Sequence, residues 1–424
     1  MSGLSSGGLS SGGWSDPATT GGEARALISR AALLHNAQLL AEEATPARLC
    51  PVVKADAYGH GAPIVADALC RLCKSDGPQR PAASMLAVVT IDEAAEIDAV
   101  LGGIGVPLLV LRPVSNTYAG RNRKLLEHAI RRGFILSLLD GGGVDDTARA
   151  AARVGARANV HVGLDTGMSR ESTDRRLFPE LIAKVRATPQ LKLHSVSTHF
   201  SDADVEDEPL TQIQAEAFAD ATEDLSDQGV LRHASNSGGT FFCHRGVFDF
   251  VRPGIALYGI DPGGKPDVRR NLRPVMRLVA PLAHIREIAA GVSVGYGRTW
   301  TAQRPSKIGL LPLGYADGVP RLAGRRAAVR IGPRDRPVYC PVVGTISMDY
   351  VTIDLTDAPH VGLGESVTVI DDDPLSPASV YAWAKHARTI PYEILTGIGR
   401  RVHRVPTDPA DIEIDDADAA EEAD

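Results

Sequence analysis

The sequence predicts an α/β protein, with a TIM-type (β/α)8 barrel followed by a mostly β C-terminal domain. Through roughly the first two thirds of the 424 residues, short β-branched runs alternate with amphipathic helical patterns. After about residue 265 the helical patterns nearly disappear, and β-rich runs are separated by Gly and Pro turns. This change of pattern indicates two domains of different architecture.

Eight apolar runs are interpreted as the barrel strands, over residues 49–55, 84–90, 107–111, 134–139, 157–164, 193–200, 231–237 and 254–259. Helical patterns with alanine and leucine at three-to-four spacing lie between them, for example over 91–103, 124–134 and 145–155. Eight such units favour a closed barrel, which typically needs about 250 residues. A doubly wound open sheet is the structural alternative.

We expect four regions along the chain. Residues 1–22 are rich in Gly and Ser, and residues 407–424 form an acidic tail, so both are predicted to be disordered. Residues 23–265 are assigned to the barrel. Residues 266–406 are assigned to the β-rich domain, which carries one late helical pattern over 376–387.

Composition narrows the classes of function. The net charge of -7 is spread along the chain without a basic block, which argues against nucleic acid or an anionic membrane as partner. No apolar run reaches the ~18 residues of a membrane span, and the start lacks the features of a signal peptide, so a cytoplasmic protein is expected. The five cysteines indicate reduced thiols. Cys70 and Cys73 form a single CxxC, interpreted as packed helix residues, and no metal site is predicted.

Polar side chains stand where the predicted strands end, and in a barrel of this kind chemistry is located at that face. These positions are Lys54, the segment 165–170, His199, Asn236 with Ser237, Arg252 and Tyr258. Phosphate sites in such barrels tend to use the loops after the seventh and eighth strands. Here those loops supply glycines, exposed amides and hydroxyls, so a phosphorylated ligand is expected.

Lys54 ends the first apolar run and has two interpretations. It could be a surface charge at the barrel rim, or an amine with a lowered pKa that forms a Schiff base with a carbonyl compound. The polar, glycine-containing turn over residues 55–61 and the phosphate site expected across the barrel favour the second. A phosphorylated aldehyde that binds an amine is pyridoxal 5'-phosphate.

The sequence resembles bacterial alanine racemases from about residue 25 to 405. The motifs that carry the resemblance, in their order along the chain, are VVKADAYGHGA, GLDTGMSR, STHFSDAD, SNSGG, VRPGIALYG, VGYGRTW, LGYADG, TISMD and PYEIL. The resemblance implies an enzyme that interconverts L- and D-alanine with pyridoxal phosphate and supplies D-alanine for peptidoglycan. It also implies a homodimer in which the β domain bears on the partner's active site, and a short strand over 23–30 that joins that domain.

The resemblance also implies catalytic roles. Lys54 would form the Schiff base with the cofactor and act as one of two racemisation bases, and Tyr296 would be the other. Arg252 would face the pyridine nitrogen and discourage its protonation, which makes the ring a weaker electron sink and suits racemisation. His199 would link Tyr296 to Arg252.

Binding roles follow in the same way. The residues that resemble the family's cofactor ligands are Tyr58, Asn236, Ser237, Gly254, Ile255 and Tyr392, together with Lys54 and Arg252. The Met348 amide and Arg170 would meet the substrate carboxylate, and Tyr315 would line the entrance.

The chain departs from the family pattern at Gly163. Family members usually have a lysine there, often carbamylated, whose negative charge holds the arginine that corresponds to Arg170. We expect a bound chloride, an ordered water or a carboxylate from elsewhere to take its place, and the small anion is slightly favoured because glycine leaves room.

Other functions stay open from the residues alone. The motif GMSR, with Ser169, resembles that of serine and broad-specificity racemases of the same fold. A non-catalytic carrier of pyridoxal phosphate would share the barrel, but such carriers are typically single-domain. A barrel decarboxylase would lack both Arg252 and a second base.

Overall fold

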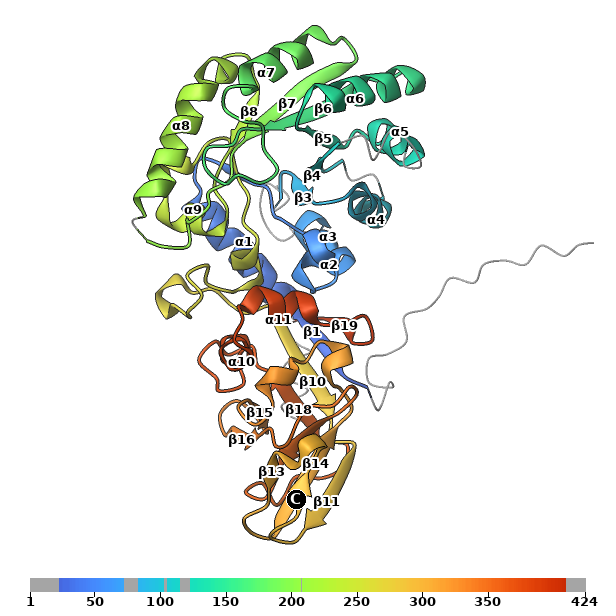
Figure 1. Ribbon diagram of the computed structural model, residues 1–424, viewed down its shortest axis with the longest axis vertical. Helices are drawn as coiled ribbons and strands as arrows, with labels where there is room; N and C mark the ends of the chain where they lie inside the picture. The colour runs from blue at the N-terminus through green and yellow to red at the C-terminus, as the bar shows by residue number, and fades with distance from the viewer. Residues whose placement is uncertain (1–22, 72–82, 103–104, 115–122, 207, 409–424) are drawn as a thin grey trace, which may run out of the picture.

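The computed structural model describes residues 23–71, 83–102, 105–114, 123–206 and 208–408 of the chain. The molecule is elongated, with a barrel at one end and a β-rich domain at the other (Figure 1). Cys73 and the terminal segments 1–22 and 409–424 lie outside the described residues. Within the described part, no helix is long and apolar enough to span a membrane.

The barrel is a sheet of eight parallel strands in the order β2-β9-β8-β7-β6-β5-β4-β3. Its strands are β2 (Arg48–Leu49), β3 (Leu86–Val88), β4 (Leu108–Val114), β5 (Ile135–Leu138), β6 (Ala158–Gly163), β7 (Leu191–Ser197), β8 (Leu231–His233) and β9 (Phe250–Val251). The ring closes between the chain after β2 and β3, where Val52 forms a parallel bridge with Ala87. The Ala87 amide donates to Pro51 O at 2.9 Å and the Val53 amide donates to Ala87 O at 2.8 Å. The predicted TIM-type barrel is confirmed.

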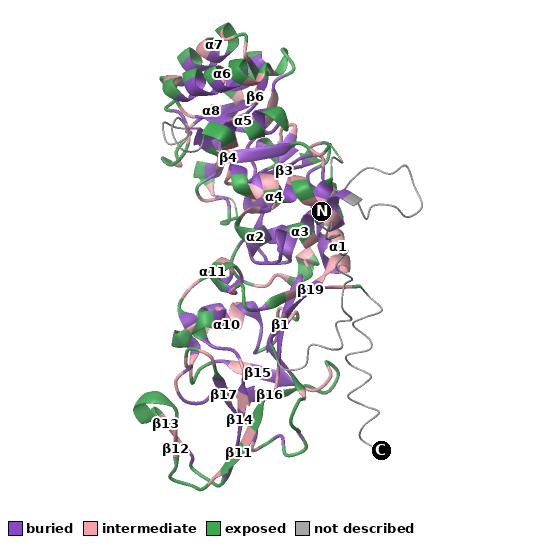
Figure 2. Cartoon of the chain, turned by 90° about the vertical axis from the view of Figure 1, so that its right-hand side faces the viewer, coloured by how far each residue is buried: buried purple, intermediate pink, exposed green. Residues whose placement is uncertain are grey.

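Helices surround this sheet in the order that the alternating pattern predicts (Figure 1). They are α1 (Arg30–Glu43), α3 (Ala62–Arg71), α4 (Ile91–Leu101), α5 (Arg123–Arg131), α6 (Gly141–Val154), α7 (Phe178–Ala187), α8 (Pro209–Ser226) and α9 (Ser237–Phe242). In α4 the buried residues are Ile91, Ala94, Ile97 and Leu101, a spacing that places them on one face. The barrel strands and the inner helix faces are buried in Figure 2.

The eighth strand differs from the prediction. Residues 254–259 were expected to form it, but Ile255–Tyr258 is a 3-10 helix, η4, and the strand is β9 just before it. Two features end the strand: Pro253 has no amide to donate to a ladder, and the amides of Gly254 and Ala256 donate to Ser237 Oγ, at 2.9 and 3.2 Å. The chain therefore leaves the sheet after Pro253, whose carbonyl still accepts from the Val52 amide at 2.9 Å.

The second domain contains a six-stranded sheet, β16-β15-β18-β10-β1-β19, a three-stranded sheet, β11-β14-β17, and the pair β12-β13. Its strands are β1 (Arg25–Ser29), β10 (Met276–Pro281), β11 (His284–Ile288), β12 (Ser293–Val294), β13 (Trp300–Thr301), β14 (Ser306–Leu311), β15 (Ala328–Ile331), β16 (Val338–Pro341), β17 (Val351–Asp354), β18 (Ser366–Ile370) and β19 (His403–Thr407). Its helices are η5 (Val268–Arg270), η6 (Tyr296–Arg298), η7 (Tyr315–Asp317), η8 (Arg321–Ala323), α10 (Val380–Ala387) and α11 (Pro391–Gly397).

The first and last described strands, β1 and β19, lie side by side in this domain. Strand β1 pairs antiparallel with β10 and parallel with β19 before the chain enters the barrel at α1. The segment over 23–30 thus joins the second domain's sheet. This pairing fixes α11 next to the barrel mouth, where it contacts α2 (Lys54–Tyr58).

Candidate active site

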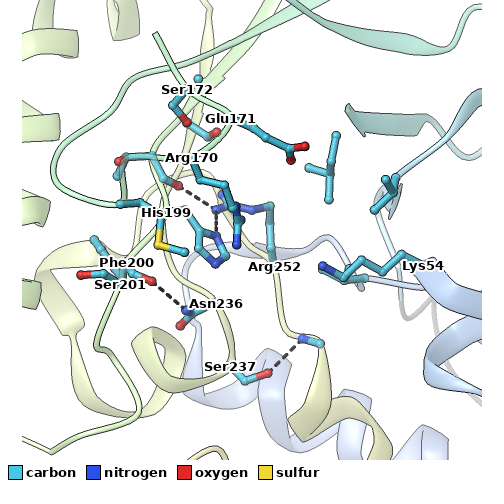
Figure 3. Close-up of a pocket in the computed structure, with 18 of the residues that line it drawn as sticks. Lys54, Arg170, Glu171, Ser172, His199, Phe200, Ser201, Asn236, Ser237 and Arg252 are labelled. Atoms are coloured by element: carbon cyan, nitrogen blue, oxygen red, sulfur yellow. Dashed lines mark hydrogen bonds between the residues drawn. The ribbon is translucent and has the colours of Figure 1, made fainter. Parts of the chain in front are cut away.

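A cavity of about 610 Å³ opens at the carboxyl ends of the barrel strands. Ten of the residues expected in the site line it: Lys54, Tyr58, Arg170, His199, Asn236, Ser237, Arg252, Gly254, Ile255 and Tyr392. Figure 3 shows the Lys54 amine pointing toward Arg252, with His199 and Arg170 on the far side. The loops that follow β6, β7, β8 and β9 therefore converge on the lysine.

Lys54 begins a left-handed turn. In α2, Ala55, Asp56, Ala57 and Tyr58 have φ values of 52°, 53°, 52° and 54°. A left-handed residue other than glycine costs about 1–2 kcal/mol, so four in succession persist only because neighbouring groups hold them. The turn reverses the chain within a few residues, and it aims both Lys54 and Tyr58 into the cavity.

Three polar side chains hold this turn. The Ala55 amide donates to Glu93 Oε1 at 2.9 Å, and the amides of residues 89 and 90 donate to Glu93 Oε2 at 2.8 and 3.0 Å. Asp56 accepts from the Ala62 amide at 2.7 Å. Arg404 Nε, from β19, donates to the carbonyl of Gly59 at 2.9 Å. Glu93 was not predicted as a site residue; the signal available in the sequence was the capping-box spacing Thr90–Glu93 at the start of α4.

Gly59 explains how the turn packs against the second domain. Its φ is +82°, and a Cβ there would lie 2.1 Å from the carbonyl oxygen of Leu395 in α11. Only glycine allows the two backbones to approach this closely. The contact brings Tyr392 of α11 to the cavity, where its ring lies 6.3 Å from that of Tyr58.

The pKa of Lys54 is lowered from its ordinary value. Burial of the amine is the main cause, and the positive charge of Arg170 is the second; Glu171 and Glu93 act in the opposite direction. A lower pKa raises the fraction of the neutral, nucleophilic amine at neutral pH. This favours the second interpretation of the lysine over a surface charge.

Arg252 is a buried cation held by neutral acceptors. Its side chain is 5% exposed. Nη2 donates to Thr198 O at 2.7 Å and to Ala234 O at 2.9 Å, and Nη1 contacts His233 Nδ1 at 2.5 Å. Within the described residues no carboxylate bonds to it, and burial lowers its pKa to about 10. Arg252 stays charged at neutral pH, and its positive charge disfavours protonation of a group placed against it.

The histidines around Arg252 are neutral. Burial, followed by the charge of Arg252, lowers the pKa of His199 to about 3 and that of His161 to about 3. His199 Nδ1 lies 3.4 Å from Arg252 Nη2 and can act there as acceptor. A neutral imidazole that accepts at Nδ1 carries its proton on Nε2. His199 can therefore donate a hydrogen bond on its other side.

Hydroxyls and amides gather at one end of the cavity. Ser237 Oγ lies within hydrogen-bond distance of the amides of Gly254 and Ala256. A Cβ on Gly254 would come 2.3 Å from Tyr58 Oη, so glycine is needed for the tyrosine to reach this end. Asn236 caps α9, with its Oδ1 accepting from the Gly239 amide at 2.9 Å. This donor set is typical of phosphate sites.

The place of the missing family lysine is occupied from within the chain. A Cβ on Gly163 would lie 2.9 Å from Ser172 Oγ, so Ser172 takes the space next to the strand. Glu171, its neighbour, lines the cavity and brings a carboxylate to it (Figure 3). Among the expected substitutes, the carboxylate has a candidate here, and the small anion stays a prediction.

Three expected residues lie outside the cavity. Tyr296, Tyr315 and Met348 belong to the second domain and are 73%, 42% and 53% exposed. Their loops contact one another: Thr345 Oγ1 donates to Tyr296 O at 3.1 Å, and the amides of Tyr315 and Ala316 donate to Ser347 O and Met348 O at 3.1 and 3.0 Å. They form one exposed surface near η6 and η7, which no described residue of the barrel covers.

Comparison with known proteins places the chain in a family. The model of the alanine racemase N-terminal domain matches residues 28–262, and the model of the C-terminal domain matches residues 275–406. The chain belongs to the alanine racemase family. The two matches together cover both domains of the fold described above.

Individual alanine racemases resemble the chain over nearly its whole length. The one from Sorangium cellulosum is 36% identical over 91% of this chain and 99% of its own, and the one from Treponema pallidum is 38% identical over 90% and 98%. Among solved structures, alanine racemase from Streptomyces coelicolor has a TM-score of 0.80 at 31% identity, with 91% of this chain and 98% of that chain covered.

One solved relative bears on the cofactor. Alanine racemase from Bartonella henselae, solved with covalently bound pyridoxal phosphate, has a TM-score of 0.76 at 29% identity and covers 91% of this chain and 99% of its own. No group of three or more His, Cys, Asp or Glu side chains within the described residues is placed to hold a metal ion.

Proposed function

We propose that the protein is a pyridoxal-phosphate-dependent alanine racemase that interconverts L- and D-alanine by a two-base mechanism. The observation that carries the proposal is that one cavity holds Lys54, an amine with a lowered pKa, opposite Arg252, a buried arginine to which no carboxylate of the described residues bonds. Membership of the alanine racemase family and the named substrate of the relatives support it.

The residues of the cavity fit pyridoxal phosphate. Tyr58, Ser237 and the amides of Gly254 and Ile255 would hold its phosphate, with Tyr392 and Asn236 completing that end of the cavity. Arg252 would face the ring nitrogen, and Lys54 would supply the amine that bonds to the aldehyde carbon. When bound, pyridoxal phosphate draws electrons away from the Cα–H bond of an attached amino acid, which makes that hydrogen acidic.

Arg252 explains why racemisation is favoured over other reactions of this cofactor. Because the guanidinium is itself a fixed cation, it would disfavour protonation of a ring nitrogen bound against it and so limit how much negative charge the ring could accept. Its four neutral contacts hold it in one orientation. A weaker electron sink favours rapid return of the proton to Cα.

Racemisation needs two bases on opposite faces of Cα. Lys54 Nζ would take or return the proton on one face, and Tyr296 Oη on the other. His199, with its proton on Nε2, would donate to the tyrosine oxygen when that oxygen is ionised and so stabilise the charged form. Arg252 in turn holds the His199 tautomer through Nδ1.

We further propose that Tyr296 comes from the partner subunit of a homodimer. Tyr296, Met348 and Tyr315 share an exposed surface of the second domain, and in one chain they do not line the cavity. In the dimer this surface would cover the partner's cavity. The Met348 amide and Arg170 would then bind the substrate carboxylate, and Tyr315 would narrow the entrance so that a small side chain such as that of alanine fits.

The cellular role follows from the product. D-alanine is a peptidoglycan building block, and we place the enzyme in the cytoplasm, where such precursors are assembled. The spread of the net charge of -7 supports small molecules, rather than nucleic acid or a membrane, as its ligands. Serine and broad-specificity racemases have no observation in their favour beyond Ser169.

A direct assay tests the proposal. Purified protein with pyridoxal phosphate is incubated with L-alanine, and optical rotation and D-alanine formation are followed beside parallel samples of L-serine. We expect the rotation of L-alanine to decay to zero as D-alanine accumulates, with a much slower reaction of L-serine. Unchanged L-alanine, or its conversion to pyruvate, would contradict the proposal; a faster reaction with L-serine would reassign the substrate.

A further inference from the structure

The charged groups of the cavity are unevenly distributed. Lys54, Arg170 and Arg252 are its lining cations, while Glu171 and Asp204 are its lining carboxylates. A cavity built for a phosphate and a carboxylate benefits from positive charge, so a carboxylate that lines it needs an explanation. Glu171 lies next to Arg170 in the chain, and Figure 3 shows it pointing into the cavity.

The loop that carries Glu171 is held at both ends. Leu164 and Thr173 form a parallel bridge, and the Thr173 amide donates to Gly163 O at 2.8 Å. Asp165 Oδ1 accepts from the amides of residues 167, 168 and 169, at 2.8, 2.9 and 3.1 Å. Arg170 and Glu171 therefore lie between two fixed segments, and both side chains reach the cavity.

Gly163 leaves room for the residue that follows Glu171. A Cβ at position 163 would lie 2.9 Å from Ser172 Oγ, so the Ser172 hydroxyl occupies the space beside the strand. A longer side chain at 163 would compete with that hydroxyl for the same space.

We propose that Glu171 is a positioning residue that supplies the negative charge balancing Arg170 and Lys54, and so sets the pH at which Lys54 loses its proton. The proposal deepens the proposed function, on which it rests. Glu171 would thus supply the negative charge beside Arg170 that the resemblance assigns to a carbamylated lysine in other members of the family.

The groups facing Lys54 single out Glu171. Arg170 and Arg252 favour loss of its proton, and Glu171 and Glu93 oppose it; the neighbouring His199 is neutral. Both oxygens of Glu93 accept hydrogen bonds from backbone amides, so its charge is partly compensated. Glu171 accepts none within the described residues. Its carboxylate is exposed to solvent, so water screens its charge in part, and it acts on Lys54 and Arg170 across the cavity rather than through a bond.

The test measures the proton affinity of Lys54 itself. Full-length wild-type protein and the E171Q, E171D and E180Q variants are freed of cofactor with hydroxylamine. Each is labelled briefly with acetic anhydride from pH 6 to 10, and the Lys54 peptide is quantified by mass spectrometry. E180Q is the matched control, because it removes the same charge at an exposed position in the first turn of α7 that does not line the cavity. In the reloaded holoenzymes, the pH profile of kcat/KM for L-alanine is a second measurement.

We expect the Lys54 labelling midpoint of E171Q to fall by about 0.5–1 pH unit, because losing a nearby anion favours the neutral amine. E171D and E180Q should keep the wild-type midpoint within about 0.2 unit, and the acidic limb of the E171Q rate profile should move in the same direction. An unchanged midpoint in E171Q overturns the proposal. A second result also overturns it: the wild-type midpoint shifts when millimolar chloride is added, while the E171Q substitution causes no shift. A bound anion, rather than Glu171, would then balance the charge. A shifted midpoint in a protein that does not racemise alanine would keep the charge coupling and reject only the reaction.

Discussion

At the scale of single residues, the site depends on a cation whose contacts are all neutral. Arg252 bonds to two carbonyls and two histidines instead of an acid. An acid in that place would neutralise the guanidinium and leave it less able to repel a proton. The same charge, together with burial, keeps the surrounding histidines unprotonated, and this has a consequence for stability.

Acid should therefore destabilise the protein through these histidines. In the folded chain the pKa of His161 is about 3, against about 6.5 in an unfolded chain. Below pH 6.5 the unfolded chain binds a proton that the folded chain does not, so the free energy of unfolding falls as pH decreases from 6.5 toward 3. At pH 5 this amounts to about 2 kcal/mol for one such histidine. At pH above 6.5 the histidine makes no difference.

The measurement is the thermal midpoint of unfolding at pH 7.5 and pH 5.0. His161→Asn should show a smaller drop between the two pH values than wild type, whatever its midpoint at pH 7.5. His284→Asn, at an exposed position of β11, is the control and should show the wild-type drop. An equal drop in all three proteins would contradict the protonation argument.

Tyr296→Phe tests the second base. The ring is exposed in one chain, so its substitution should leave folding and cofactor absorbance unchanged. Loss of the hydroxyl should reduce racemisation about 10²–10⁴-fold, the usual contribution of an acid–base group. Tyr350→Phe, at another exposed tyrosine of the same domain, is the control. Near-wild-type turnover by Tyr296→Phe would remove the tyrosine from the mechanism.

At the scale of elements, the left-handed turn α2 and the start of α4 form one unit. Glu93 accepts from the amides of residues 55, 89 and 90, and so connects the cap of a helix to the chain next to Lys54. The Thr90 side chain completes the capping box by accepting from the Glu93 amide. Two substitutions can therefore distinguish the contribution of the helix cap from that of the bond to the lysine turn.

Thr90→Ala and Glu93→Gln are predicted to differ in their effect on cofactor binding. Each weakens the cap and should cost about 1 kcal/mol of stability. Glu93→Gln also weakens the bond to the Ala55 amide, since a neutral amide oxygen is a poorer acceptor than a carboxylate. We expect it alone to raise the dissociation constant for pyridoxal phosphate several-fold, as measured by absorbance titration. Equal dissociation constants would show that the turn does not depend on Glu93.

At the scale of the whole molecule, the cavity and Tyr296, the proposed second base, lie on different domains. Strand β1 joins the second domain's sheet and α11 rests on α2, so the domains are connected on the side of the cavity that carries Tyr392. The surface with Tyr296 and Met348 is exposed instead. In the proposed dimer, each chain would contribute a cavity to one site and a covering surface to the other.

Mixed dimers test this division. Lys54→Ala and Tyr296→Phe proteins should each be nearly inactive. After subunit exchange, a mixed dimer holds one site with both substitutions and one with neither, so an equal mixture should recover about a quarter of wild-type activity by random pairing. Lys54→Ala exchanged with itself is the control. If exchange is demonstrated by mass-tagged subunits and activity stays absent, each chain builds its own site.

Some features of this protein were determined by the sequence alone. The alternation of apolar runs and helical patterns indicated the barrel, because burial periodicity is a local property of the chain. The resemblance motifs named the family and the residues that line the cavity, and the start of the second domain was visible as a change of pattern. The candidate site was therefore largely predictable as a set of residues.

Tertiary structure decided how those residues are held and which ones meet. The eighth strand ends at Val251 rather than at 259, because the amides of Gly254 and Ala256 are bonded to Ser237. Glu93 stands 38 residues from Ala55, and no local pattern predicts a contact over that separation. No local pattern predicts that Ser172 fills the space beside Gly163 either. Closing the barrel brings distant backbone amides and side chains together, and such contacts depend on the geometry of the whole fold.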